Sequence, residues 1–196
     1  MKKLLLIITF AFAALCSNAQ ASSEHLKFKG VPIDGTVTEF AKKLEEKGFK
    51  TLMAQGGSYI MSGDFAGYSD CMIVLMNTKS TKEVYGIGVI PSFCDTWSEL
   101  ISQYDTFKDN LTTKYGEPTG CTEEFKGWTP SSDMSKFYAA QIGDCDYKTL
   151  FELKNGSIAV AITNKKKGSE KSCYVVLIYT DKVNEAKEKQ NVIDDL

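Results

Sequence analysis

Apolar residues recur at helical spacing in two stretches, and each stretch begins with the same signal. Thr36 is followed three residues later by Glu39, and Thr96 by Glu99, which is typical of a capping box at a helix N-terminus. The apolar positions behind each threonine come every three or four residues: Val37, Phe40, Ala41 and Leu44, then Trp97, Leu100, Ile101, Tyr104, Phe107 and Leu111. The sequence therefore predicts two helices, each with its N-cap at the threonine.

Short runs rich in β-branched and aromatic residues follow each predicted helix, as expected for strands. They cover residues 49–54, 58–65, 69–77 and 83–91, and then 119–125, 136–142, 147–154, 157–164 and 172–180. Because an antiparallel sheet needs a helix over its apolar face, this order predicts an α+β fold. We expect a tandem repeat of a helix followed by an antiparallel β-meander, with a first unit at 20–93, a second unit at 94–181 and a polar C-terminal tail at 182–196.

Some of the predicted strands are apolar on both faces. In the strand at 69–77, Cys71, Ile73 and Leu75 alternate with Met72, Val74 and Met76, which is typical of a central strand that is covered on both sides. Two other strands carry small residues at every second place, namely Gly86 and Gly88, and Ala159 and Ala161. Small residues let a helix or a partner come close to the sheet, and here we expect a helix.

The first residues have the pattern of an export signal. Met1-Lys2-Lys3 precedes an apolar run from Leu4 to Leu15, and the small-residue box Ser17-Asn18-Ala19 follows it. These are the three parts of a secretory signal peptide, and the run is shorter than the roughly 20 residues that span a bilayer. We expect a signal peptide at 1–19 and a secreted or periplasmic protein. Acylation of Cys16, as in an outer-membrane lipoprotein, is the alternative.

The charged residues argue against nucleic acid as a partner. The chain has 23 basic and 25 acidic residues, for a net charge of −2, and every basic residue is a lysine. Arginine is the side chain that reads phosphate and guanine in a bidentate manner, and it does not occur here. We therefore expect no nucleic-acid partner. Beyond the signal, no stretch is long and apolar enough to predict a transmembrane segment, and the oligomeric state stays open.

Five cysteines lie beyond the predicted signal peptide: Cys71, Cys94, Cys121, Cys145 and Cys173. In an oxidising compartment, spaced cysteines usually form disulfides. We predict Cys71–Cys94 in the first unit, because antiparallel pairing brings the ends of their strands together. In the second unit we predict Cys121–Cys145 with Cys173 free, and Cys145–Cys173 is the alternative.

The sequence offers little catalytic chemistry. The one histidine, His25, lies in a segment that we expect to be flexible, which leaves a nucleophile or a metal without a histidine. Two carboxylate pairs have spacings that suit a cation or an acid pair: Asp144 with Asp146, and Asp64 with Asp70. Polar turns explain both pairs more simply, since calcium takes more oxygen ligands than two. We predict no enzymatic activity, no cofactor and no metal.

Aromatic residues in or beside the predicted turns are the candidate binding residues. They are Trp128, Tyr59, Phe65, Tyr68 and Tyr147. Aromatic side chains often anchor protein interfaces, although most aromatic residues near strands fill the core instead. Trp128 stands out because its surroundings, rich in glycine, proline and serine, offer few apolar neighbours in the sequence.

Two stretches carry a resemblance to known proteins. The segment from Gly30 to Phe49 resembles the start of uncharacterised secreted proteins common in the Bacteroidetes, and the helix ending Lys114-Tyr115-Gly116-Glu117-Pro118 fits the same group. The predicted order of helix and meander is also similar to that of β-lactamase-inhibitor proteins and related small envelope proteins. This resemblance implies protein binding through a sheet surface, and it carries no individual site residue over to this chain.

Together these patterns favour a non-enzymatic binding protein that recognises a protein or an envelope component through a sheet face and nearby loops. Two alternatives remain open, a carboxylate-based hydrolase of glycans or peptides and a small-ligand carrier with a pocket between the two units. Carboxylates that face each other across a cleft favour the hydrolase, whereas an enclosed apolar cavity favours the carrier.

Overall fold

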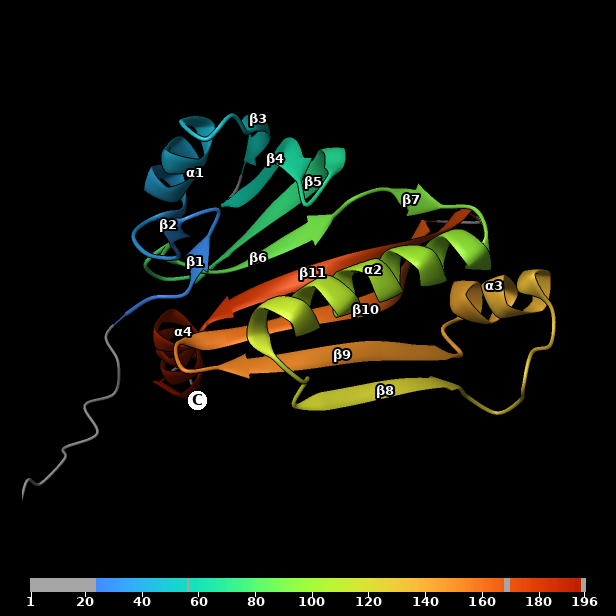
Figure 1. Cartoon of the computed structure of the whole chain (residues 1–196). Helices are drawn as coiled ribbons and strands as arrows, with labels where there is room; N and C mark the ends of the chain where they lie inside the picture. The colour runs from blue at the N-terminus through green and yellow to red at the C-terminus, as the bar shows by residue number, and fades with distance from the viewer. Residues whose placement is uncertain (1–23, 56, 168–169, 195–196) are drawn as a thin grey trace, which may run out of the picture.

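The computed structural model describes residues 24–55, 57–167 and 170–194 (Figure 1). The signal peptide predicted at 1–19 and the alternative lipid site at Cys16 lie outside these residues. The described part is a mixed α+β fold, as the sequence predicted, and its strands form a large antiparallel sheet. In chain order its elements are β1 (Lys27–Phe28), β2 (Val31–Pro32), α1 (Val37–Glu45), β3 (Lys50–Gln55), β4 (Ser58–Phe65), β5 (Tyr68–Asn77), β6 (Val84–Ile90), β7 (Phe93–Cys94), α2 (Trp97–Tyr115), β8 (Gly120–Phe125), α3 (Asp133–Ile142), β9 (Cys145–Leu153), β10 (Gly156–Lys167), β11 (Glu170–Asp181) and α4 (Lys182–Asp194).

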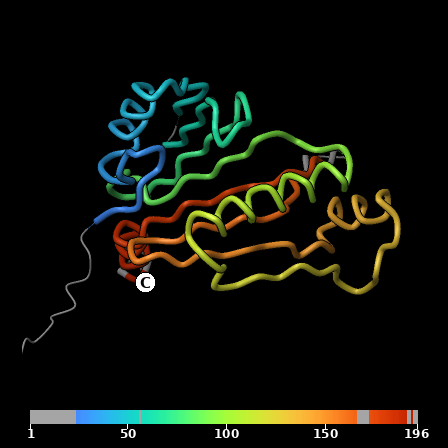
Figure 2. Tube along the Cα trace, viewed as in Figure 1, coloured from blue at the N-terminus to red at the C-terminus, as the bar shows by residue number. Residues whose placement is uncertain are grey.

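Within the described residues, strands β3 to β11 form one nine-stranded sheet. Its main path runs β3-β4-β5-β6-β11-β10-β9-β8, and the short β7 pairs with β11 beside that path. The last strand, β11, pairs with β6 along the middle of the sheet (Figure 2). The structure therefore does not show the predicted tandem repeat with a separate sheet in each unit. The predicted boundary between residues 93 and 94 falls inside a single sheet, because β11 pairs with the first half of the chain.

Helices α1, α2 and α3 pack on the same face of the sheet (Figure 1). The α1 residue Thr38 bonds Tyr59 on β4, and the α2 residue Tyr104 bonds Thr149 on β9. Beneath the helices, one row of directly opposed residues crosses most of the sheet and is almost fully buried: Met61, Ile73, Val89, Leu177, Val160 and Thr149. This row is the floor of the hydrophobic core.

The capping signals that predicted α1 and α2 are present in the structure. The Glu39 amide donates to Thr36 Oγ1 at 3.3 Å, and the Thr36 amide donates to Glu39 Oε2 at 2.9 Å, which completes the capping box. In α2 the Glu99 amide donates to Thr96 Oγ1 at 3.2 Å, while Glu99 Oε2 accepts from the amide of Asp95, one residue before the cap. The capping box predicted for α1 is therefore confirmed in full. For α2 the threonine caps the helix as predicted, but Glu99 does not bond back to the Thr96 amide.

The strand predicted at 136–142 is wrong, because this segment lies in helix α3. The N-cap of this helix is Ser132, whose hydroxyl accepts from the Ser135 amide at 3.2 Å. Its buried residues Ala139 and Ala140 are small, so the helix lies close to the sheet, and Asn164 of β10 donates to the Ala140 carbonyl at 2.7 Å. The large apolar side chains of this ten-residue segment do not share one helical face, since Met134 and Tyr138 are exposed, so the sequence offers little periodicity to separate a helix from a strand.

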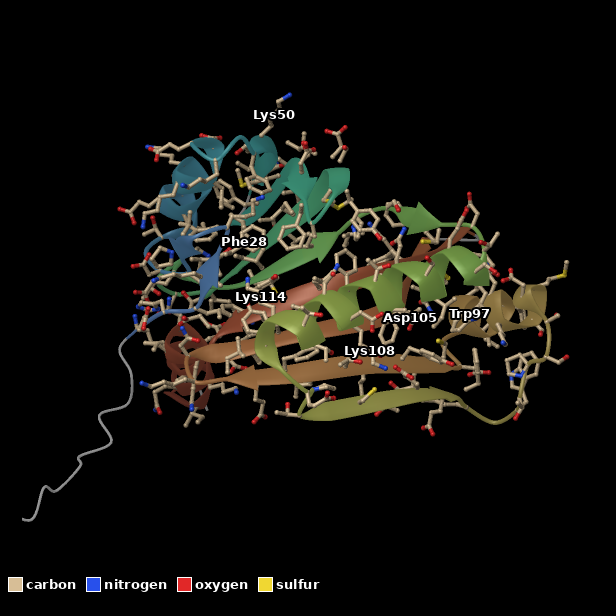
Figure 3. All side chains as sticks on the ribbon, in the orientation of Figure 1. Phe28, Lys50, Trp97, Asp105, Lys108 and Lys114 are labelled. Atoms are coloured by element: carbon tan, nitrogen blue, oxygen red, sulfur yellow. The ribbon has the colours of Figure 1, made fainter. Side chains whose placement is uncertain are left out.

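Both ends of the described chain are anchored to the sheet. His25, which we expected in a flexible leader, has its Nδ1 atom 3.1 Å from a carboxylate oxygen of Asp181, and Asp181 is completely buried. Phe28 of β1 stacks on Phe65 with ring centroids 5.4 Å apart (Figure 3). The predicted polar tail forms α4, and Asn184 in its first turn is buried. None of the helices in these described segments is long and apolar enough to cross a bilayer.

Candidate functional site

Four of the five predicted aromatic binding residues lie on the face of the sheet that the helices cover. Tyr59 bonds Thr38 of α1 at 2.9 Å. The other three contact aromatic rings of the core, with ring centroids 5.1 to 5.8 Å apart. These pairs are Phe65 with Phe28, Tyr68 with Phe107, and Tyr147 with Trp97 and with Tyr104. The structure therefore uses these side chains mainly for packing and does not bring them together as a binding surface.

Trp128 has a different environment from the other four. It lies between β8 and α3, and 41% of its surface is exposed. A large aromatic ring with that exposure can anchor a partner, whereas the other four predicted residues contact α1 or rings of the core. Trp128 is therefore a single exposed anchor rather than part of a cluster.

Lysine side chains and a backbone amide contact the carboxylates singled out in the sequence. Asp146 lies between Lys148 and Lys126, with oxygen–nitrogen distances of 3.2 and 3.5 Å. Partial burial alone raises its pKa, but the hydrogen bond from Lys148 and the charges of both lysines lower the pKa below its ordinary value. Asp64 accepts a hydrogen bond from the Asp70 amide at 3.1 Å, as in a polar turn. In the part of the chain that the structure describes, no group of three or more His, Cys, Asp or Glu residues can hold a metal ion.

Two further carboxylates, Asp105 and Glu123, influence each other where α2 faces β8; Figure 3 labels Asp105 and Lys108 on α2. Glu123 of β8 accepts a short hydrogen bond from Lys108 of α2, which lowers the Glu123 pKa. Burial and then the Glu123 charge raise the pKa of Asp105, one turn before Lys108. Acid–base pairs in enzymes have pKa values that are pushed apart in this way. However, both side chains lie largely at the surface, and structural ion pairs give the same pattern.

The predicted disulfides Cys71–Cys94 and Cys121–Cys145 are not formed, and all five cysteines of the described residues are free. Cys121 lies opposite Thr149, four residues along β9 from Cys145. At about 3.3 Å per residue, that offset is roughly 13 Å, whereas a disulfide joins Cα atoms less than about 7 Å apart. Cys94 lies opposite Cys173 of β11 rather than beside Cys71. The pairing of the strands thus differs from the pairing assumed in the prediction.

A row of uncharged residues crosses the sheet on the face opposite α1, α2 and α3, and we call it the open-face row. Strand pairing places its members directly opposite one another, strand after strand: Met53, Ile60, Val74, Gly88, Ile178, Ala159, Leu150 and Gly120. Among the described residues α1, α2 and α3 all pack on the opposite face, and α4 lies where β11 ends (Figure 1). The row therefore crosses the sheet with no described helix over its middle.

The neighbouring positions on the open face extend this surface and give it polar borders. Two residues along the strands, Met72, Ile90, Val176 and Ala161 form a second apolar line. In the opposite direction Ser157 and Thr180 line a small cleft together with Lys182 and Glu185 at the start of α4. The second line ends toward the β8 edge at Lys148, a charged residue that lies directly opposite Ala161. An apolar centre with a polar rim is the usual anatomy of a protein interface.

A second concave feature lies on the helix-covered side, between the N-terminal hairpin and the end of α2. It is a cleft of about 450 Å³, and its lining combines basic and aromatic side chains, namely Lys27, Lys29, Lys114, Phe65, Tyr115 and Tyr179. The Lys114 ammonium lies 4.9 Å from the centre of the Tyr115 ring. Burial raises the pKa of Tyr179, which keeps its hydroxyl protonated. The cleft suits a small ligand with an anionic group and an apolar body.

The open-face row was visible in the sequence but was interpreted differently. Two of its members, Gly88 and Ala159, belong to the alternating small residues for which we predicted a covering helix. Helices α1, α2 and α3 lie instead on the opposite face, where the side chains of the same strands are large. Of the described helices, only the start of α4 comes near the open face, where Lys182 and Glu185 line a cleft with Ser157 and Thr180. The alternation of Met72, Val74 and Met76 with buried residues was the clearest available signal of a second apolar face.

Comparison of the chain with protein-family models, with curated proteins and with solved structures found no match in any of the three.

Proposed function

We propose that this chain is a non-enzymatic binding protein that works outside the cytoplasm, secreted or in the periplasm, and holds a protein or an envelope component against its open sheet face. The observation that carries the proposal is the open-face row, which crosses the sheet without a charged side chain. Apolar surface on this scale is unfavourable in water and usually marks a site of interaction. Export would put this surface where it can meet an extracellular or envelope partner.

The size of the surface fits this role. Eight strands at a spacing of about 4.8 Å make the row roughly 34 Å wide, and the lines on either side add about 13 Å along the strands. The resulting area, on the order of 450 Å², is about half of what one partner buries in a standard interface. A partner must therefore also contact loops at the rim, which agrees with the expected combination of sheet face and loops.

The surroundings of the carboxylates favour binding over hydrolysis. Asp146 is held by two lysines, and Glu123 is held by Lys108. Each of these carboxylates is thereby kept ionised and occupied, whereas a general acid needs a raised pKa and access to the substrate. Asp105 has a raised pKa, but its side chain is largely exposed to solvent.

The experiment compares capture of a partner by the tagged protein and by two variants of equal charge. Ile178→Lys places an ammonium at the centre of the open-face row, and Met134→Lys places one on α3, where the side chain is 83% exposed. We expect a partner from the envelope or the medium to bind the unmodified protein and Met134→Lys, and to be lost with Ile178→Lys. A partner retained equally by all three proteins, or no partner above background, contradicts the proposal.

A folding control keeps this test decisive. Circular dichroism and the thermal midpoint report whether Ile178→Lys is folded. If it is not, Met53→Lys tests the same row at the edge strand β3, where the side chain is already 40% exposed and a lysine can reach water.

The lysine-lined cleft supports a second candidate function, that of a carrier for a small anionic ligand. Native mass spectrometry of the protein as purified tests it, since a carried ligand adds its own mass to the folded species. Lys114→Gln should remove that mass while capture of a protein partner stays unchanged. A spectrum of the folded protein without added mass, even after incubation with medium-chain fatty acids, argues against the carrier.

We also propose that the two halves of the sheet derive from one helix-plus-meander unit, as in the β-lactamase-inhibitor proteins that the sequence resembles. Strands β3 to β6 follow α1 and are consecutive neighbours, and β8 to β11 follow α2 in the same manner. Helix α3 and strand β7 have no described counterpart in the first half. Folding of residues 20–93 on their own would support two units, and a chain fragment that stays unfolded would speak against them.

A further inference from the structure

Two buried thiols stand directly opposite each other where β7 pairs with β11. Cys94 is 3% exposed and Cys173 is fully buried, and the antiparallel register makes them partners. The next pair along the same two strands, Phe93 and Tyr174, packs edge to face with ring centroids 5.4 Å apart. The pairing of these short segments is therefore supported by side chains as well as by the backbone.

The strand geometry places the two cysteines within reach of one bond. Directly opposed residues in an antiparallel pair have Cα atoms about 4.5 or 5.5 Å apart, and both values lie within the range of about 4.4–6.8 Å found for disulfides. Cys145 on β9 is the next nearest thiol, but β10 separates β9 from β11. Two strand spacings of about 4.8 Å put Cys145 roughly 10 Å from Cys173, which is too far for a bond.

We propose that Cys94 and Cys173 form a structural disulfide when the chain folds in the presence of a disulfide oxidant. The thiolate of one cysteine attacks the oxidant disulfide, which releases one thiolate and leaves a mixed disulfide on the protein. The second cysteine then attacks the protein sulfur of that mixed disulfide, forms the Sγ–Sγ bond and releases the other thiolate. Two protein thiols lose two protons and two electrons, and the oxidant is reduced to two thiols.

The environment of the pair determines when this reaction occurs. The pKa of both thiols is raised to about 11, by burial in each case, and for Cys94 the charge of Glu99 contributes to the rise. Because the thiolate is the nucleophile in disulfide exchange, the folded reduced protein reacts slowly. The bond therefore forms during folding, before β7 docks, and once formed it is shielded from reductants.

The bond would constrain the connection between the two halves of the chain. It closes a loop of about 80 residues and fixes β7 immediately before Thr96, the N-cap of α2. Loops of this length give disulfides a large effect on the unfolded chain. For a chain of this size we expect reduction to lower the thermal midpoint by roughly 10 °C.

The direct test is a non-reducing peptide map of the full chain after refolding from urea with reduced and oxidised glutathione. We expect one linked peptide pair, Cys94 with Cys173. A link of Cys173 to Cys145, a link of Cys94 to Cys71, or a refolded protein whose thiols all react with iodoacetamide in urea would overturn the proposal. This measurement uses the unmodified chain, so it does not depend on a variant that folds.

Two variants give an independent readout. Cys94→Ala should remove the dependence of the thermal midpoint on reductant. Cys71→Ala is the matched control, because Cys71 is equally buried on β5 and has no cysteine opposite it; it should keep that dependence. Equal dependence on reductant in both variants contradicts the assignment of the bond to Cys94.

Discussion

The carboxylate of Asp181 joins three segments of the chain, and its exchange for asparagine tests how much that junction stabilises the fold. Its oxygens accept from the Leu26 amide at 2.8 Å and from the Asn184 amide at 2.9 Å, and His25 Nδ1 lies 3.1 Å away. An asparagine side chain would keep the shape of the aspartate, but one carboxylate oxygen would be replaced by an NH2 group that faces other donors. A hydrogen bond to a charged group contributes about 1.5–3 kcal/mol, and a buried donor without an acceptor costs about 1–3 kcal/mol.

We therefore expect Asp181→Asn to lower the free energy of unfolding by about 3 kcal/mol. Urea denaturation measures this change, and with a slope of about 2 kcal/mol per molar urea the midpoint should fall by about 1.5 M. The matched control is Asp34→Asn, which makes the same chemical change in an exposed ion pair with Lys43 and should cost less than about 1 kcal/mol. Equal midpoints for the two variants would refute the reasoning.

Two further predictions concern α2 and its contacts. The lowered pKa of Glu123 means that its contribution is present above its ordinary pKa and is lost as the pH falls through the folded value, so Glu123→Gln should destabilise at pH 7. Asp105 has a raised pKa, so its charged form destabilises the folded protein and Asp105→Asn should stabilise it at pH 7. Both changes in the free energy of unfolding should stay below about 1 kcal/mol because the groups are partly exposed. Urea midpoints of the two variants that move in the same direction contradict this prediction. Trp97 is 6% exposed and lies beside the Tyr147 ring, so Trp97→Ala should lower the free energy of unfolding by about 3–5 kcal/mol. Trp128→Ala should lower it by less than about 1 kcal/mol. Similar urea midpoints for the two variants would count against the core position of Trp97.

Local signals in the sequence predicted the local structure well. Thr36 and Thr96 cap the two helices because a capping box needs only residues within one turn of each other. The helix faces were equally readable, since Phe40 and Tyr104 follow a period that the chain itself sets. Helix α3 was missed because its buried face consists of alanines, and because the serine that caps it has Ser135 rather than a glutamate three residues later.

The sequence could predict the environment of a single residue from its neighbours in the chain, but not a site assembled from distant segments. Trp128 was set apart from the core aromatics because a loop rich in glycine and proline offers few apolar neighbours, and 41% of its surface is exposed. Tyr147 and Phe65 were not separable from core residues, since an aromatic ring beside a turn can face either side of a sheet. The cleft lined by Lys27 and Lys114 joins segments that are far apart in the sequence, and no local pattern links them.

What the sequence by itself determined is the content of the fold: an α+β chain, two capped helices, and strands with two apolar faces. What only the tertiary structure decided is how these parts meet. The pairing of β6 with β11 merges two expected sheets into one, aligns the residues of the open-face row and sets Cys94 against Cys173. The physical reason is that capping and periodicity depend on residues within a few positions of each other. Strand pairing depends on hydrogen bonding and burial between segments far apart in the sequence, and the sequence of one strand does not specify its partner.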